Sequence, residues 1–144
     1  MRHLALLLCT PALLAQAPCM GYGTFEAWMK GTTVPGYKLM ECQKDGPEYS
    51  AAFMGATPES VLMVRCGPLA QFNQYKSMKD ALQNVREFTF RGLKAVSFQL
   101  AGMPMLQIEL KKHGSYLTLG GPEGANPMEL EKLALALKVD EKAK

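Results

Sequence analysis

Three consecutive segments in the second half of the chain alternate apolar and polar residues. They cover residues 94–100, 105–111 and 115–120, and short links containing glycine join them. Successive side chains of a β-strand point to opposite faces, so this alternation collects the apolar residues on one covered face. Links of this length join antiparallel neighbours as hairpins. The pattern therefore predicts an antiparallel sheet packed against a core.

Four further segments have the composition of strands. They lie at 37–43, 49–54, 61–66 and 87–91, and turns with Gly, Pro or Asp punctuate the chain around them. The segment 61–66 is almost continuously apolar, which is typical of a strand covered on both faces. Together with the alternating segments, these predict a sheet of about six or seven strands.

Two segments carry apolar residues at helical spacing, at 68–84 and 126–138. Pro68 suits the first turn of the former. In the latter, Asn126 is a suitable N-cap and Glu129 stands where a capping-box acid belongs. We therefore predict an α+β fold in which both amphipathic helices pack on one face of the sheet. The predicted apolar stripes are Phe72, Tyr75, Met78, Leu82 and Val85, and Leu130, Leu133, Ala134 and Leu137.

The chain of 144 residues fits one domain, which we place at 36–138. Residues 18–35 form a lead-in, with either a short helix or irregular structure at 24–30. Residues 139–144 are a charged tail that we expect to fray. With 16 Lys and Arg against 13 Asp and Glu, the net charge of +3 is too small to favour nucleic acid.

Residues 1–17 have the pattern of a secretory signal peptide. Arg2 precedes an apolar run, and residues 15–17 (AQA) match a small-x-small cleavage site. The run is about half of the roughly 20 residues that span a membrane, and no later stretch is longer. We therefore expect export to the periplasm or cell surface, without a transmembrane span in the mature chain. An alternative makes Cys19 the lipid-bearing first residue of a bacterial lipoprotein, although Pro18 stands where a small residue is expected.

Removal of the signal peptide leaves Cys19, Cys42 and Cys66. In an oxidising compartment two of them should pair, and Cys42 and Cys66 both lie in predicted strands. The alternative is that these two are buried thiols that pack as small hydrophobic side chains. If Cys42 and Cys66 pair, Cys19 is left over for a lipid, a mixed disulfide or a dimer bridge.

A copper(I) site is a second hypothesis, because thioether and thiolate ligands select that ion. Its ligands would be drawn from Met103, Met105 and His113, with Cys42 and Cys66. The competing interpretation is that methionines fill gaps in a core. The sequence favours a non-catalytic protein without a cofactor, because His113 is the one histidine after the signal peptide and no nucleophile–base motif accompanies it. A small hydrolase ranks last.

Aromatic residues on the predicted strands are candidates to line a binding groove. We therefore predict a non-catalytic envelope module that binds a partner protein or an apolar small molecule. A periplasmic protein that handles thiols or copper(I) is the alternative. The candidate binding residues are Tyr37, Tyr49, Phe88, Phe90 and Tyr116.

Overall fold

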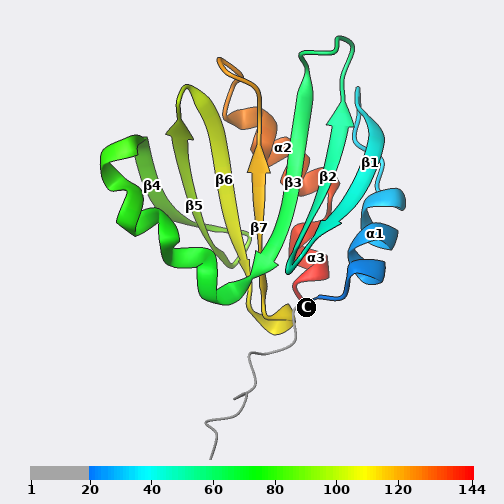
Figure 1. The fold of residues 1–144 in the computed structure, drawn as a ribbon, viewed down its shortest axis with the longest axis horizontal. Helices are drawn as coiled ribbons and strands as arrows, with labels where there is room; N and C mark the ends of the chain where they lie inside the picture. Colours follow the sequence, from blue (N-terminus) through cyan, green and yellow to red (C-terminus); the bar gives the residue numbers. More distant parts are fainter. Residues whose placement is uncertain (1–19) are drawn as a thin grey trace, which may run out of the picture.

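The computed structural model describes residues 20–144, so the predicted signal peptide and Cys19 lie outside the described residues. Seven strands form one antiparallel sheet in the order β1-β2-β3-β7-β6-β5-β4 (Figure 1). This confirms the α+β class and the antiparallel sheet. The strands are β1 (Lys38–Asp45), β2 (Glu48–Met54), β3 (Val61–Pro68), β4 (Leu82–Phe90), β5 (Leu93–Leu100), β6 (Met103–Leu110) and β7 (Ser115–Gly120).

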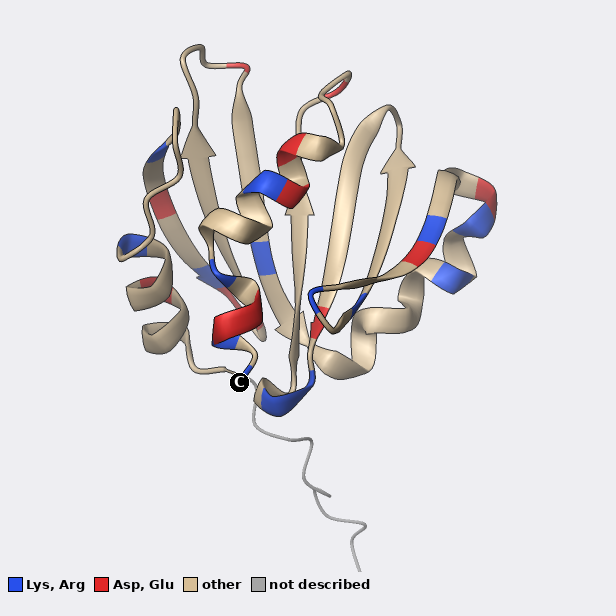
Figure 2. Cartoon of the chain, turned by 180° about the vertical axis from the view of Figure 1, so that it is seen from behind, with Lys and Arg blue, Asp and Glu red and all other residues tan. Residues whose placement is uncertain are grey.

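Helices cover both faces of this sheet. The α-helices α1 (Tyr22–Lys30), α2 (Met128–Ala136) and α3 (Val139–Lys142) lie on one face. The 3₁₀ helix η1 (Leu69–Ala81), green in Figure 1, lies on the other, as the reverse view in Figure 2 confirms. A short turn, η2 (Lys111–His113), links β6 to β7. No helix of the described residues is long and apolar enough to cross a membrane.

The two predicted helices therefore lie on opposite faces, and the expectation that they share one face is wrong. Neighbouring residues of a strand point to opposite faces. In β6, Leu106 packs on the side of α2, whereas Met105 packs on the side of η1. In β7, Leu117 and Tyr116 divide in the same way. Because the central strands carry apolar side chains on both faces, each face needs its own helical cover.

The larger core lies between the sheet and the three α-helices. The alternating apolar residues of β6 and β7 point into it, including the fully buried Ile108 and Leu119. Those of β5, Val96 and Phe98, pack in the smaller core on the other face. Helix α1 contributes Phe25 and Trp28. The Trp28 indole Nε1–H donates a hydrogen bond of 2.8 Å to the carbonyl oxygen of Leu137, which ties α1 to the end of α2.

The C-terminal residues pack into this core instead of fraying. Val139, the first residue of α3, is 0% exposed. A ring nitrogen of His113, Nε2, lies 2.6 Å from the carbonyl oxygen of Lys142 and joins η2 to the end of α3. The charged residues around Val139 suggested a solvated tail, but Val139 and Ala143 are both buried in the larger core and hold this short helix in place.

The smaller core lies beneath η1, where Phe72 and Tyr75 pack on β5. The Tyr75 ring stacks on Phe98 with 6.4 Å between ring centroids. The segment is a 3₁₀ helix interrupted at Met78 and shorter than the predicted helix. From Leu82 onward the chain pairs with β5, so Val85 of the predicted stripe lies in β4 and is exposed.

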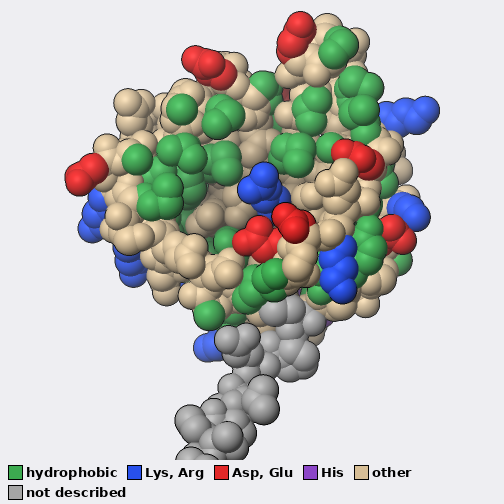
Figure 3. Space-filling view, viewed as in Figure 1, with side chains coloured by type: hydrophobic (Ala, Val, Ile, Leu, Met, Phe, Trp, Pro, Cys, Tyr) green, Lys and Arg blue, Asp and Glu red, His purple; other side chains and the backbone are tan. Residues whose placement is uncertain are grey.

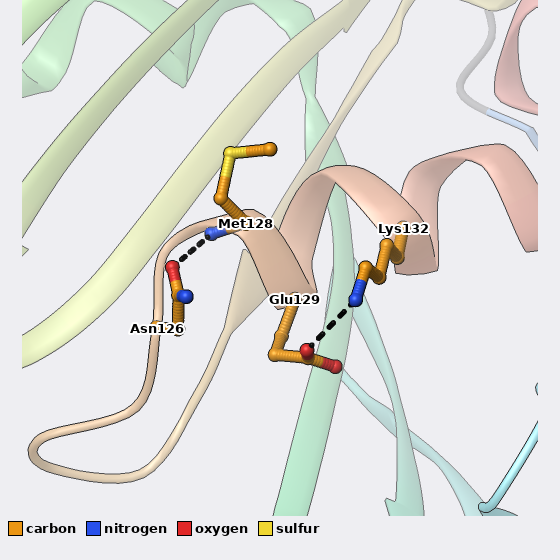
Figure 4. A network of polar contacts seen from close by, with 4 residues as sticks. All are labelled: Asn126, Met128, Glu129 and Lys132. Carbon is orange, nitrogen blue, oxygen red and sulfur yellow. Dashed lines mark hydrogen bonds and ion pairs between the residues drawn. The ribbon is translucent and has the colours of Figure 1, made fainter.

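The start of α2 follows the sequence prediction in one respect. The Asn126 side-chain oxygen accepts a hydrogen bond of 2.9 Å from the backbone N–H of Met128, so this residue caps the helix (Figure 4). Glu129 does not complete a capping box. Its carboxylate lies 3.3 Å from the Lys132 ammonium, one turn further along the helix.

Both edge strands of the open sheet are irregular. The pairing of β1 with β2 shifts register between Leu39 and Glu41. The pairing of β4 with β5 shifts between Gln83 and Arg86, and Asn84 in that interval has a φ of 54°. Such bulges twist and interrupt the strand that contains them.

Candidate functional site

A cavity of about 190 Å³ opens between η1 and the sheet. We call it the η1 groove. On this face, Figure 3 shows apolar side chains on either side of a hollowed centre, where charged side chains of both signs also lie. An apolar cavity of about 150 Å³ is enough to hold benzene. The η1 groove therefore has room for one ring-sized apolar group. Its apolar lining includes Met78, Leu82, Phe98, Leu100 and Met105.

Two of these apolar lining residues, Met78 and Met105, are methionines. Met78 lies on η1 and is 45% exposed, so its thioether is at the mouth of the groove. Met105 lies across Gly120 of the neighbouring strand, where a Cβ atom would come within 3.1 Å of the Met105 sulfur. Methionine side chains are flexible and polarisable, so such a lining adapts to apolar groups of different shapes.

A row of polar side chains crosses the sheet beside the apolar lining. Ser50, Arg65, Thr118 and Gln107 occupy paired positions on four adjacent strands. The Gln107 Nε2 donates a hydrogen bond of 3.3 Å to the Thr118 hydroxyl. The other amide atom, Oε1, is buried without a hydrogen-bond partner among the described residues. Arg65, Gln107 and Thr118 line the groove and supply hydrogen-bonding groups next to its apolar part.

Tyr116 lies beside this row, two residues before Thr118 on β7, and reaches over β3. Its ring passes over Gly67, where a Cβ atom would lie 3.1 Å from the ring. Burial raises the pKa of Tyr116, as does the Glu48 carboxylate, whereas the Thr118 hydrogen bond and the Arg65 charge oppose the rise in pKa. The phenol is therefore protonated at neutral pH.

A hydrogen bond from the Tyr75 hydroxyl to the Glu87 carboxylate fastens η1 to β4. Burial and this carboxylate raise the pKa of Tyr75 to about 12. The same hydrogen bond, helped by the charges of Lys76, Lys94 and Lys79, lowers the pKa of Glu87. The pair therefore keeps a neutral phenol and an ionised carboxylate over the physiological pH range, and it holds one side of the groove in place.

The five aromatic residues singled out from the sequence do not form one site. Tyr116 lines the η1 groove. Tyr37, Tyr49, Phe88 and Phe90 pack against the larger core on the opposite face. Their positions in the strands set these directions, and the sequence alone did not show which face would stay open.

The predicted disulfide is also corrected. Cys42 lies on β1 and Cys66 on β3, and no disulfide joins them. Strand β2 separates them, because Cys42 pairs with Ala51 and Cys66 with Tyr49. Two strand spacings amount to roughly 9–10 Å. That is beyond the limit of about 7 Å between the Cα atoms of a disulfide.

The structure does not bring the copper(I) candidates together. Met103 and Met105 lie at the start of β6, and His113 follows its end. The strand from Met103 to Leu110 is about 23 Å long at roughly 3.3 Å per residue. Among residues 20–144, no three His, Cys, Asp or Glu side chains are grouped so that they could hold a metal ion.

Sequence reasoning missed the polar row of the η1 groove. Arg65 and Thr118 are far apart in the chain and become neighbours only through the pairing of β3 with β7. The available signal was a polar residue inside each of these otherwise apolar strands. Comparisons with protein-family models, with curated proteins and with solved structures found no match for this chain. Its function therefore has to be inferred from its own residues.

Proposed function

We propose that this chain is an exported, non-catalytic module that binds a partner protein of the cell envelope. In this proposal the η1 groove accepts one apolar side chain of the partner. The observation that carries the proposal is the cavity of about 190 Å³ with apolar walls and a polar row beside it. An apolar small molecule is the alternative occupant of the same groove.

The chemistry of the groove supports a peptide-like ligand. A protein segment offers an apolar side chain and, next to it, backbone N–H and C=O groups that need hydrogen-bond partners. The groove offers apolar walls and, next to them, the Arg65 guanidinium and the Gln107 amide. At protein interfaces, a few anchor side chains buried in pockets and surrounded by weaker contacts contribute most of the binding free energy.

A display library of random peptides tests this proposal directly. We expect selected peptides to contain an aromatic or branched aliphatic anchor. We expect Met78→Lys to weaken their binding at least tenfold, because a charge then stands at the mouth of the apolar cavity. The measurement is the Kd of a selected peptide by isothermal titration calorimetry.

Met40→Lys is the matched control, because Met40 is even more exposed and lies outside the groove. The proposal is contradicted if both variants bind the peptide like the unmodified chain. If no peptide is selected but a small aromatic molecule binds in a Met78-dependent way, the small-molecule alternative replaces the partner protein.

Export is proposed from residues 1–17 alone. We expect the protein recovered from its native host to have an intact mass that lacks these residues. If Cys19 is the mature N-terminus, the mass also includes a lipid, and the protein is anchored at the membrane. Recovery of the full-length chain from the cytosol contradicts export without affecting the groove, so the two parts of the proposal are tested separately.

A further inference from the structure

Two cavities adjoin one another on the face opposite the η1 groove. One, of about 510 Å³, lies between α2 and the connection from α1 to β1. The other, of about 520 Å³, lies between the end of α1 and α3. Thr33, Ala136 and Lys138 line both cavities, so the two lie side by side. We call the combined space the α2 groove. Figure 2 shows α2 and α3 on this face.

The two halves of the α2 groove differ in chemistry. The first half is lined mainly by apolar side chains, including the buried Val34, Leu62 and Leu133. Leu135 forms an exposed part of its lining and is 42% exposed. The second half is lined by more polar residues, which include Thr32, Thr33, Glu141 and Lys142. Each half is within the range of roughly 300–1,000 Å³ that is usual for small-molecule sites.

Lys138 stands at the junction of the two halves in an unfavourable backbone conformation. It follows α2 with φ 52° and ψ 47°, in the left-handed region. Glycine is the usual residue at such a helix end, because a Cβ atom is strained there. Residues in such conformations cost free energy, and they are concentrated at functional sites. A lysine is therefore held at this junction in a conformation that glycine would adopt with less strain.

The charges around the groove leave the Lys138 ammonium available for a ligand. Within residues 20–144, no carboxylate forms an ion pair with it. Lys132 is paired with Glu129 at 3.3 Å, and the Lys142 ammonium lies 5.8 Å from the centroid of the Trp28 ring. Glu141 is the remaining acidic residue of the lining, so the basic side chains are in excess.

We propose that the α2 groove binds a single-chain anionic amphiphile. The alkyl chain lies in the apolar half, against Leu133 and Val34, and the anionic head group lies at the Lys138 ammonium. A carboxylate and a phosphate head group share this chemistry. The site is separate from the η1 groove, because the two lie on opposite faces of the sheet and share no lining residue.

Trp28 provides the readout for this proposal. It is the only tryptophan of the chain, is 7% exposed and lines the polar half of the groove. Titration with laurate below its micellar concentration is expected to change the Trp28 emission and to saturate at one molecule per chain. Dodecyl phosphate is expected to bind as well. Whichever of laurate and dodecyl phosphate has the lower Kd identifies the preferred head group, carboxylate or phosphate. Dodecyltrimethylammonium is expected to bind at least tenfold more weakly than laurate.

The decisive variant is Lys138→Gly. It removes the ammonium and relieves the backbone strain, so we expect a higher Tm and at least a tenfold weaker affinity for laurate. Leu135→Asp is the second variant, and we expect a similar loss of affinity because it places a like charge at the edge of the apolar half. Lys112→Ala, on η2, is the control and should bind like the unmodified chain.

The proposal is overturned if Lys138→Gly raises the Tm but binds laurate unchanged, because Lys138 then has no part in ligand binding. Equal binding of laurate and dodecyltrimethylammonium also overturns it, since only apolar contact is then involved. Met78→Lys should leave laurate binding unchanged, so a failure of the η1 groove and a failure of the α2 groove are distinguishable.

Discussion

Val139→Asp is expected to destabilise the fold by roughly 3–5 kcal/mol, the cost of an unpaired charge in a protein interior. The side chain of Val139 is fully buried in the larger core, so the introduced carboxylate has no access to water in the native structure. The free energy of unfolding from urea titration, followed by circular dichroism, measures this effect. Such a loss is a large part of the total stability of a typical domain.

Asp140→Ala is the matched control for this prediction. Asp140 is the next residue of α3 and is not part of the buried core. We expect a change within about 0.5 kcal/mol, as for most surface substitutions. If Val139→Asp also changes the free energy of unfolding by no more than about 0.5 kcal/mol, residues 139–144 are not packed against the sheet. The sequence prediction of a frayed tail would then be correct.

Phe72→Ala is expected to cost about 3–5 kcal/mol, the usual range for loss of a buried phenylalanine. The Phe72 ring is 2% exposed and lies between Tyr75 and Tyr116, with centroid distances of 6.4 Å and 5.9 Å. It is the central side chain of the smaller core. We therefore expect η1 to lose its hold on the sheet, which would also remove one wall of the η1 groove.

Urea titration measures the stability of the Phe72→Ala variant, and amide hydrogen exchange shows where the structure opens. We expect faster exchange in η1 than in β6 and β7, which the larger core still covers. Phe72→Leu keeps most of the apolar volume and should cost less than the alanine variant. Uniform acceleration of exchange across all strands would contradict the separation into two cores.

Alternation along the strands made much of the sheet predictable. A period of two is a local property, so β5, β6 and β7 could be placed from the sequence within a few residues. The capping role of Asn126 could also be predicted, because it depends only on the next two residues of the chain. The side of the sheet that η1 covers depends on the path of the chain after Pro68, which no local pattern specifies.

The candidate sites were less predictable, because they depend on strand pairing. The pairing of Arg65 with Thr118 depends on β3 and β7 becoming neighbours at the centre of the sheet. The same pairing rules separate Cys42 from Cys66, although both stand in strands with apolar neighbours. Lys138 gave no signal in the sequence, since its left-handed conformation is visible only in the folded chain.

The irregular edge strands determine how other proteins can approach this molecule. A regular, unpaired strand at a sheet border invites backbone pairing with a second chain, and interruptions with charged residues discourage it. Here β1 and β4 both have such interruptions, next to Glu41 and Arg86. We therefore expect copies of the chain to resist joining border to border into fibrils. Incoming molecules would have to dock on the broad sides of the sheet, where the two grooves open.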